Sequence, residues 1–461
     1  MKGRSRLVPL IVASPMFLQN IDTSAMAIAL PSIAASLQVP ALQLNLIITT
    51  YLLSLAVFLP MSAWLADRFG AKRMFCMAIV LFSLASALCG TATSLATLVV
   101  CRIIQGMGAA MMVPVGRLIL VRSVPPSELI TAMVWYTVPP TIGRLAGPLV
   151  GGAIVSVTSW HWIFFVNIPF GVVAVLLALV FVEDSRPEGP PPAFDVAGFL
   201  LIAIGLAAML GALETAGKGL IPGWLSALAA AVGASALGLY GLRNRRRAES
   251  LIDLRVLAFR TFRTNALGAV PLRLAVLAVP FLLPFMLQMG FGLSPLASGL
   301  LTAASAVGAL CTRGIMRWAI DRHGFRRLLL GATVLTSAIY MSYALFGPAT
   351  PHALMFCVLF LGGVLTSICM VSLNTLGFAE LPKERMSHAT VVISMAQQLT
   401  AGFGVVLAAA LLALFSRSHG GDGVHLLAQD FSATFVALGL TALLSLFSFV
   451  RLKPDDGDEL R

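Results

Sequence analysis

Long apolar runs alternate with short polar segments along the whole chain. A helix of about 20 apolar residues can cross a bilayer, and fourteen such runs are present. They lie at residues 8–33, 44–66, 74–93, 97–121, 129–156, 162–182, 194–214, 222–242, 265–289, 296–320, 327–347, 353–378, 387–415 and 431–451. The pattern predicts an all-α integral membrane protein with 14 transmembrane helices.

The composition supports this prediction, because 59% of the residues are hydrophobic and only 11% are charged. Six cysteines fall within apolar runs and form no C-x-x-C motif. We interpret them as small buried apolar residues and not as a disulfide or metal framework. No G-x-x-x-x-G-K-[ST] motif is present, which argues against direct coupling to ATP hydrolysis. We expect no cofactor and no metal.

A net charge of +12 could indicate a nucleic-acid partner, but the basic residues argue against that. Nearly all lie in one alternate set of loops, and the opposite set holds little beyond Lys218 and Arg417. The first set comprises Lys2, Arg4, Arg6, Arg68, Lys72, Arg73, Arg122, Arg186, the segment Arg243 to Arg263, Arg322, Arg326, Arg327, Lys383, Arg385, Arg451 and Lys453. Because positive charge favours the cytoplasmic side, we expect a multi-pass protein of the inner (plasma) membrane with both termini cytoplasmic.

Two charged segments divide the chain. Residues Glu183 to Asp195 read as a linker, and Arg243 to Arg263 read as a cytoplasmic segment, with two spans between them. The sequence DRFGAKR at Asp67 recurs as DRHGFRR at Asp321, each time after the second span of a six-span block. We therefore predict a six-helix bundle at 1–183, a linker with two inserted helices at 184–264, and a second bundle at 265–461.

Asp22 lies inside the first apolar run, in the segment MFLQNIDTSAMAIALP. A charge in the middle of a span costs roughly 2.5–3.5 kcal/mol, so such a carboxylate is usually paired, protonated or next to water. Of the nineteen acidic residues, all except Asp22 and Glu214 fall in loops, tails or span ends, and Glu214 belongs to the outer end of the inserted pair. Asp22 is the prime functional candidate.

Five segments carry recognisable motifs: NIDTSAMAIALPSIA, AWLADRFGAKR, CRIIQGMGAA, GRLAGPLVGG and SWHWIFFVNIPFG. Together they resemble motifs of the major facilitator superfamily, and within it those of the fourteen-helix drug:proton antiporters. One subgroup of multidrug exporters is most similar, through WLAD, MMVPVGRL and SWHWIF. The sequence departs from the family pattern at Ala63, Ala71, Arg144 and His161.

The resemblance implies an exporter that works by alternating access and is driven by protons, with Asp22 and Arg102 in proton coupling. It also implies conformational-switch residues in the loop and glycine motifs. These are Asp67, Arg68, Gly70, Lys72, Arg73, Gly143, Gly147, Pro148, Gly151, Gly152, Asp321, Arg322, Gly324 and Arg326. Because Gly143, Gly147 and Gly151 are spaced four apart, they predict close helix packing, and a bend at Pro148 is the compatible functional interpretation.

Arg102, Arg144 and Arg273 lie within spans, where an unpaired cation is costly. If all three face one cavity, the pocket would suit a carboxylate-bearing substrate. Neutral polar groups could bind substrate or join helices. They are Gln19, Asn20, Gln105, Asn374 and Gln397.

We therefore expect a monomeric, proton-coupled exporter of small molecules in the lipid bilayer, most consistent with multidrug efflux. An exporter of organic anions and a uniporter or importer of the same fold remain as alternatives. A membrane enzyme or receptor is disfavoured because H-E-x-x-H and nucleophile-elbow motifs are absent. The inserted pair, with Glu214 and Lys218 near its outer end, is expected to be peripheral.

Overall fold

The computed structural model describes residues 3–40, 43–124, 129–183, 194–215, 222–246, 254–382, 386–418, 426–453 and 455–457. This part of the chain is helical and contains no strand. It divides into two compact units, Met1–Val39 with Leu46–Leu251 and Pro40–Asn45 with Ile252–Arg461. Most of the predicted linker, part of the Arg243 to Arg263 segment, Lys218, Lys383 and Arg385 lie outside the described residues.

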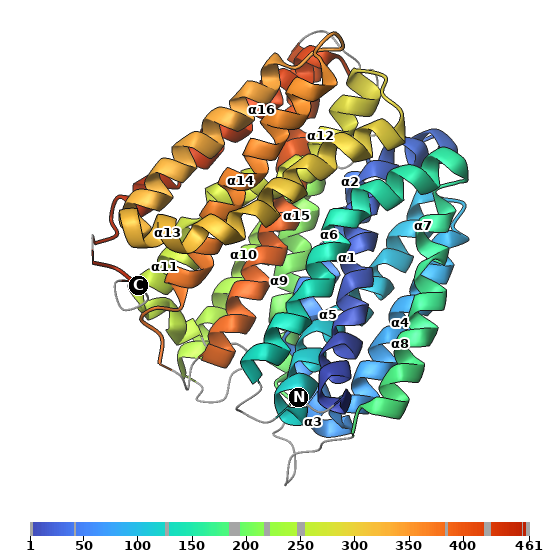
Figure 1. The fold of residues 1–461 in the computed structure, drawn as a ribbon, viewed down its shortest axis with the longest axis vertical. Helices are drawn as coiled ribbons and strands as arrows, with labels where there is room; N and C mark the ends of the chain where they lie inside the picture. Colours follow the sequence, from blue (N-terminus) through green and yellow to red (C-terminus); the bar gives the residue numbers. More distant parts are fainter. Residues whose placement is uncertain are drawn as a thin grey trace. The chain divides into compact units, whose positions relative to one another are not determined.

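The first unit contains ten helices in the described part of the chain (Figure 1). They are α1 (Gly3–Leu37), α2 (Asn45–Phe58), α3 (Met61–Phe69), α4 (Ala71–Gly90), α5 (Leu95–Ser123), α6 (Leu129–Val157), α7 (His161–Phe165), α8 (Asn167–Phe181), α9 (Val196–Thr215) and α10 (Gly223–Arg246). α7 and α8 form one apolar segment that is interrupted at Val166. Pro169 explains the interruption because it has no N–H to donate to the preceding turn.

α6 packs along α1 through the predicted glycine face, as Figure 1 shows. A Cβ on Gly143 would lie 2.5 Å from the backbone oxygen of Phe17, and one on Gly151 would lie 2.7 Å from the Cα of Ala25. A Cβ on Gly147 would collide with the hydroxyl of Ser24. The glycine spacing therefore produces the close approach of backbones that the sequence predicts.

The second unit is built from longer helices and several short helical turns. They are η3 (Leu254–Ala258), α11 (Arg260–Arg263), η4 (Thr264–Gly268), α12 (Val270–Phe285), η5 (Met286–Gly290), α13 (Pro295–Ser342), η6 (Tyr343–Leu345), α14 (His352–Gly377), α15 (Met386–Ser418), α16 (Ala428–Leu443) and α17 (Leu446–Phe449). α12 packs on α15 and α16, and α13 packs on α14. The long α13 contains two predicted spans joined across a kink at Gly324.

The sequence repeat corresponds to a repeated backbone feature. Gly70, between α3 and α4, has φ 92°, and Gly324, within α13, has φ 71°. Side-chain-bearing residues rarely adopt these angles. Each glycine therefore allows the chain to leave one span and start the next without a long loop.

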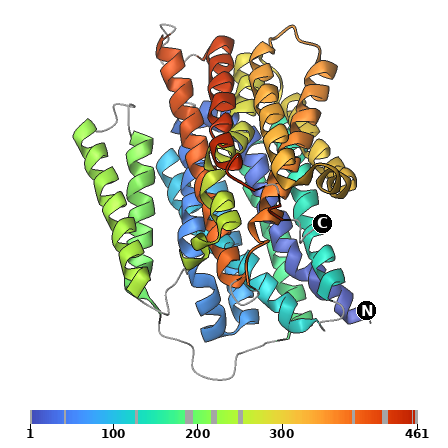
Figure 2. The same ribbon diagram turned by 90° about the vertical axis from the view of Figure 1, so that its left-hand side faces the viewer.

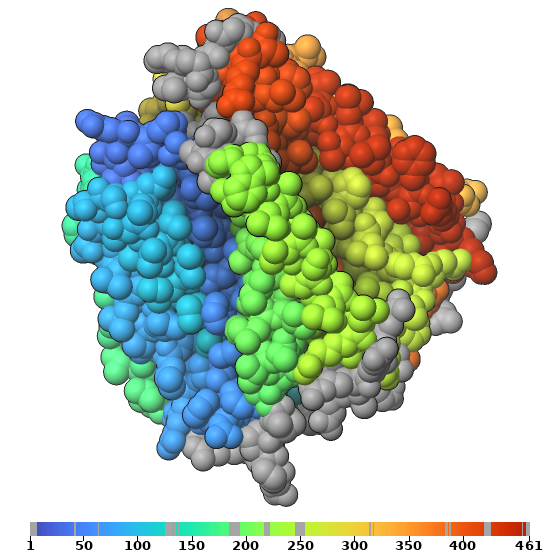
Figure 3. All heavy atoms as spheres, turned by 180° about the vertical axis from the view of Figure 1, so that it is seen from behind, coloured from blue at the N-terminus to red at the C-terminus, as the bar shows by residue number. Residues whose placement is uncertain are grey.

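The two inserted helices, α9 and α10, form an antiparallel hairpin (Figure 2). They cross where Gly205 meets Leu237 and Gly233 meets Met209. Figure 3 shows this hairpin, in green, on the surface of the molecule. Several large apolar side chains of α10 are exposed, among them Trp224, Leu228, Val232, Leu239 and Leu242. Such a surface suits contact with lipid.

The hairpin is tied to the first unit through Glu214, which is only 5% exposed. Its carboxylate accepts a hydrogen bond of 3.1 Å from the hydroxyl of Thr49 on α2. At the other end of the hairpin, Arg243 pairs with Asp195 at 2.7 Å. The structure thus groups the inserted helices with the first unit.

Two sequence expectations change. The count of fourteen spans is not confirmed, because twelve of the described helices are long and apolar enough to cross a membrane, and α2, with 14 residues, is shorter. Pro60 follows the end of α2 and separates it from α3.

The prediction of buried cysteines is wrong for Cys311 and Cys357, because both are exposed. A thiol behaves as a small apolar group and suits an outward-facing apolar surface equally well.

Candidate functional site

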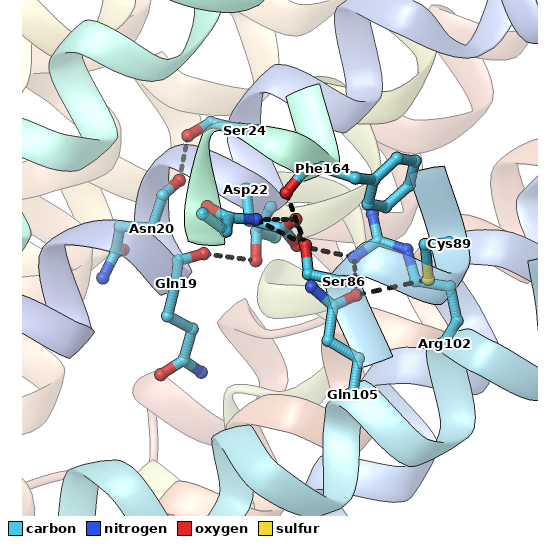
Figure 4. Close-up of polar contacts among 11 residues, drawn as sticks. Gln19, Asn20, Asp22, Ser24, Ser86, Cys89, Arg102, Gln105 and Phe164 are labelled. Atoms are coloured by element: carbon cyan, nitrogen blue, oxygen red, sulfur yellow. Dashed lines mark hydrogen bonds and ion pairs between the residues drawn. The ribbon is translucent and has the colours of Figure 1, made fainter. Parts of the chain in front are cut away.

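Asp22 and Arg102 form a buried ion pair in the first unit. The carboxylate of Asp22 on α1 is fully inaccessible, and Arg102 on α5 is 1% exposed. The Nη1 atom of Arg102 lies 2.5 Å from Oδ2 of Asp22 (Figure 4). The two residues predicted to act in proton coupling are thus in direct contact.

Two amide side chains complete the surroundings of the carboxylate. Gln105 donates from Nε2 to Oδ1 of Asp22 at 3.3 Å, and Asn167 donates from Nδ2 to the same oxygen at 3.1 Å. Arg102 also donates to Oε1 of Gln105 at 2.8 Å. All four hydrogen bonds suit a negative carboxylate and a positive guanidinium.

Aromatic rings cover the guanidinium of Arg102. Its Cζ atom lies 5.3 Å from the ring centre of Tyr51 and 4.9 Å from that of Phe164. These distances fit cation–π contacts, and the rings exclude water from the ion pair. The interaction between the two charges is therefore weakly screened.

The local sequence explains how α5 presents this site. Arg102 and Gln105 are three residues apart, so they share one helix face. Gly106 lets α5 approach α2, because a Cβ there would lie 2.7 Å from the Cβ of Ser54. Ser54 in turn donates to the carbonyl of Ile103 at 2.6 Å. The R-x-x-Q-G pattern thus combines the charge, its amide partner and the close helix contact.

Asn167, Ser86 and Tyr51 belong to the site but were not predicted from the sequence. Asn167 is 1% exposed and Ser86 is fully buried. Asn167 donates to Oγ of Ser86 at 3.0 Å, and Ser86 donates to the carbonyl of Phe164 at 2.9 Å. An asparagine within an apolar span, two residues before Pro169, was the available signal.

Gln19 and Asn20 precede Asp22 on α1 by three and two residues. The amide oxygen of Asn20 accepts two contacts of 3.4 Å from the guanidinium of Arg144 on α6. Gln19 is 8% exposed, and its Oε1 has no hydrogen-bond partner among the described residues. Arg144 is exposed and has no carboxylate within ion-pair distance in the described part of the chain. Arg144 can therefore receive a negatively charged group.

Arg273 occupies a different environment in the second unit. It is 1% exposed and donates to the carbonyl of Asn265 at 2.6 Å and to the Oδ1 of the same residue at 2.5 Å. The structure therefore gives both Arg102 and Arg273 internal partners, and Arg144 is the accessible one of the three.

The predicted polar residues Gln397 and Asn374 contact each other. Gln397 on α15 donates to Asn374 on α14 at 3.1 Å, which joins these two helices.

The predicted switch residues form contacts at helix ends. Asp67 accepts from Arg122, at the end of α5, at 3.1 Å, and both side chains are about one-third exposed. Lys72 donates to the carbonyl of Leu179 at 2.7 Å. In the second unit, Arg326 donates to the carbonyl of Val450 at 3.0 Å.

Other charged residues of the two repeated segments lie close to the glycines Gly70 and Gly324. The guanidinium of Arg68 lies 5.6 Å from the ring of Trp64. Asp321 and Arg322 are exposed beside Gly324. The described residues contain no cluster of three His, Cys, Asp or Glu side chains that could hold a metal.

The chain is similar to known transporters over nearly its whole length. The sequence profile of the Major Facilitator Superfamily matches residues 14–405 and, in a second match, residues 266–460. MdtD of Klebsiella pneumoniae, provisionally named a multidrug resistance protein, is 37% identical over 97% of this chain and 94% of its own length. MdtD of Salmonella paratyphi B is 37% identical over 96% of this chain and 94% of its own length.

Solved structures support the fold. A POT family transporter in complex with a thioalcohol-conjugated peptide has a TM-score of 0.71 at 15% identity, covering 97% of this chain and 96% of its own. A bacterial homologue of the human lysosomal transporter Spinster has a TM-score of 0.66 at 16% identity, covering 98% of each chain. The predicted resemblance to the major facilitator superfamily, and within it to a subgroup of multidrug exporters, is confirmed. This chain is a member of the major facilitator superfamily and a membrane transporter, not an enzyme.

Proposed function

We propose that this protein is a proton-coupled exporter that removes a range of small molecules from the cell by alternating access. The observation that carries the proposal is the buried contact between Asp22 and Arg102. The provisional multidrug name of the MdtD relatives supports the breadth of substrates. The protein acts as a monomer in the inner membrane, with both termini cytoplasmic and without a cofactor.

Proton binding at Asp22 changes the charge balance of the site. In the present arrangement a carboxylate and a guanidinium neutralise each other in a dry environment. A proton on Asp22 leaves Arg102 as an uncompensated buried cation, which favours a rearrangement that brings water or a substrate to the site. The proton and the substrate are thereby linked to different conformations.

The available energy is sufficient for export. One charge crossing a potential of 100 mV provides about 2.3 kcal/mol, which corresponds to a concentration ratio of about 50-fold. The pH gradient adds to this. A single proton-binding carboxylate can therefore drive accumulation outside the cell.

Close contact between α1 and α6 gives the movement a mechanical basis. Asp22 lies on the helix that the glycines of α6 contact, two residues from the Ser24 that faces Gly147. A shift of α1 after proton uptake therefore changes its packing against α6. The contact of Asp67 with Arg122 ties the cytoplasmic ends of α3 and α5 in one conformation of the cycle.

Export of organic anions is a second candidate, and Arg144 is the observation that favours it. Among the described residues, its exposed guanidinium donates to the neutral amide oxygen of Asn20, at 3.4 Å, and forms no ion pair. Guanidinium groups bind carboxylates through paired hydrogen bonds. A carboxylate-bearing substrate could be held there, beside the proton site.

Purified protein in liposomes containing a pH-sensitive dye tests the proposal. Ethidium and carboxyfluorescein serve as cationic and anionic probes, and an exported probe must move protons in the opposite direction. Asp22→Asn should abolish this proton movement while the protein remains folded. Uphill export by Asp22→Asn at the wild-type rate would contradict the mechanism.

A further inference from the structure

The side chain of Asn167 links the proton site to the junction between α7 and α8. Its Nδ2 atom donates to Oδ1 of Asp22 at 3.1 Å and to Oγ of Ser86 at 3.0 Å. The hydroxyl of Ser86 on α4 donates a hydrogen bond of 2.9 Å to the carbonyl of Phe164 in α7. Figure 4 shows Asp22, Ser86 and Phe164 gathered around this chain of bonds.

Every polar side-chain hydrogen of Asn167 and Ser86 is already used in a hydrogen bond. An amide group has two N–H hydrogens, and Asn167 uses one on Asp22 and one on Ser86. The single hydrogen of Ser86 is used on Phe164. The carboxylate of Asp22 therefore meets donors only, from Arg102, Gln105 and Asn167.

A protonated Asp22 needs an acceptor, and the present arrangement provides none among these partners. Gln105 is poorly suited to supply one, because its Oε1 already accepts from Arg102 at 2.8 Å. Turning that amide over would place its N–H groups against a cation. Asn167 has no such cation on its oxygen and can turn over at lower cost.

We propose that Asn167 is a positioning residue that couples the protonation of Asp22 to the packing of the α7–α8 junction against α4. Its amide donates to the carboxylate and, after turning over, accepts the hydrogen of the carboxylic acid at Oδ1. Ser86 then turns its hydroxyl from the carbonyl of Phe164 to Oδ1 of Asn167. No covalent bond changes other than the O–H formed on Asp22, and the contact between α4 and α7 is released.

This inference rests on the proposed proton coupling at Asp22. The other charged or titratable groups around the carboxylate are Arg102 on α5, Tyr51 on α2 and Cys89 on α4. Arg144 on α6 contacts Asn20, which precedes Asp22 by two residues. On α7, His161 is stacked on Trp160 and contacts Ser159, and α8 has no charged or titratable residue.

Infrared difference spectra of the purified full chain in lipid, recorded between alkaline and acid pH, test the inference without a substrate. We expect a carboxylic acid band that Asp22→Asn removes, together with a change in a side-chain amide band that isotope-labelled asparagine identifies. Asn167→Leu should remove the amide change. Asn244→Leu is the matched control, because Asn244 is also buried but donates to Tyr240 on its own helix; it should leave the amide change in place.

The outcomes separate the two proposals. Absence of an acid band that depends on Asp22 would overturn proton coupling at this residue. An acid band with an amide change that persists in Asn167→Leu would overturn only the role of Asn167.

Asn167→Asp covers the case in which the leucine variant does not fold. At acid pH the introduced carboxyl is protonated and can donate one hydrogen bond and accept another, so proton-driven export of the probe that the wild type transports should recover. At alkaline pH two adjacent carboxylates repel and export should fall at least about tenfold, the effect of roughly 1.4 kcal/mol. Equal export by this variant and the wild type across the pH range would refute the role of Asn167.

Discussion

The guanidinium of Arg102 lies 2.5 Å from the carboxylate of Asp22, and neither side chain is more than 2% accessible. Each charge is therefore the main compensation for the other in a dry environment. The pair joins α1 to α5, although its members are 80 residues apart in the sequence. Stability and transport should depend on both residues together.

Removing one member of this pair should cost more than removing both. Arg102→Met leaves a buried carboxylate without its cation, and we expect a loss of about 3–5 kcal/mol of stability. Asp22→Asn combined with Arg102→Met should recover most of that loss, although proton coupling stays absent. Chemical denaturation of the purified variants measures both effects.

The partly exposed pair of Asp67 and Arg122 is the control for this comparison. Asp67→Asn should cost less than about 1 kcal/mol, because water screens exposed pairs. If the effects of the Asp22 and Arg102 substitutions were simply additive, the two charges would not compensate each other.

The sequence predicted which residues form the proposed proton site better than it predicted how they are arranged. Asp22 stood out as a carboxylate within an apolar run, and Arg102 belonged to a recognisable motif. Asn167 and Ser86 are neutral residues of common types, and only the packing of α4 and α8 against α1 reveals that they surround the charge. Partners that arise from tertiary packing leave little trace in local sequence.

The glycine face of α6 should not tolerate a side chain. Gly147→Val would force a branched side chain into the space that Ser24 occupies, so α6 must move away from α1. Overpacking of this kind costs about 1–3 kcal/mol, and we expect lower thermal stability together with loss of export.

Gly211→Val on α9 is the matched control, because among the described residues no atom beyond the adjacent backbone of its own helix lies within 4 Å of the position that a Cβ would take there. It should reduce thermal stability much less than Gly147→Val. Equal stability of the two variants would show that the close contact between α1 and α6 is not required.

Substitution of Gly70 or Gly324, the glycines of the repeat, should lower stability for a different reason. Gly70→Ala and Gly324→Ala introduce a Cβ at backbone angles of φ 92° and φ 71°, at a cost of about 1–3 kcal/mol each. The measurement is the melting temperature of each variant in detergent.

Gly331→Ala lies within the regular helix of α13, with nothing close to its Cβ position. It should be neutral or stabilising, because alanine is favoured over glycine in helices. Unchanged stability of both repeat variants would argue against a strained turn at these glycines.

The fold class was predictable because an apolar run must be long enough to cross the bilayer, and because the recurrence of DRFGAKR as DRHGFRR marks two similar blocks. Helix ends were less predictable. α2 ends at Phe58 because Pro60 follows it, whereas the apolar run continues to residue 66. The kink in α13 depends on the backbone angle of Gly324, which hydropathy does not report.

Substitution of Arg144 should affect substrate binding, whereas substitution of Arg273 should affect stability. Arg144 is exposed and weakly held by Asn20, so Arg144→Gln should leave stability nearly unchanged. If the substrate is anionic, this variant should raise the KM for carboxyfluorescein about tenfold, since a hydrogen bond to a charged group contributes roughly 1.5–3 kcal/mol. Arg273→Gln should mainly reduce stability, because the buried guanidinium holds the backbone and side chain of Asn265. Initial export rates in liposomes and melting temperatures separate these effects. An unchanged KM for the anion in Arg144→Gln, with ethidium export also unchanged, would remove Arg144 from the substrate path.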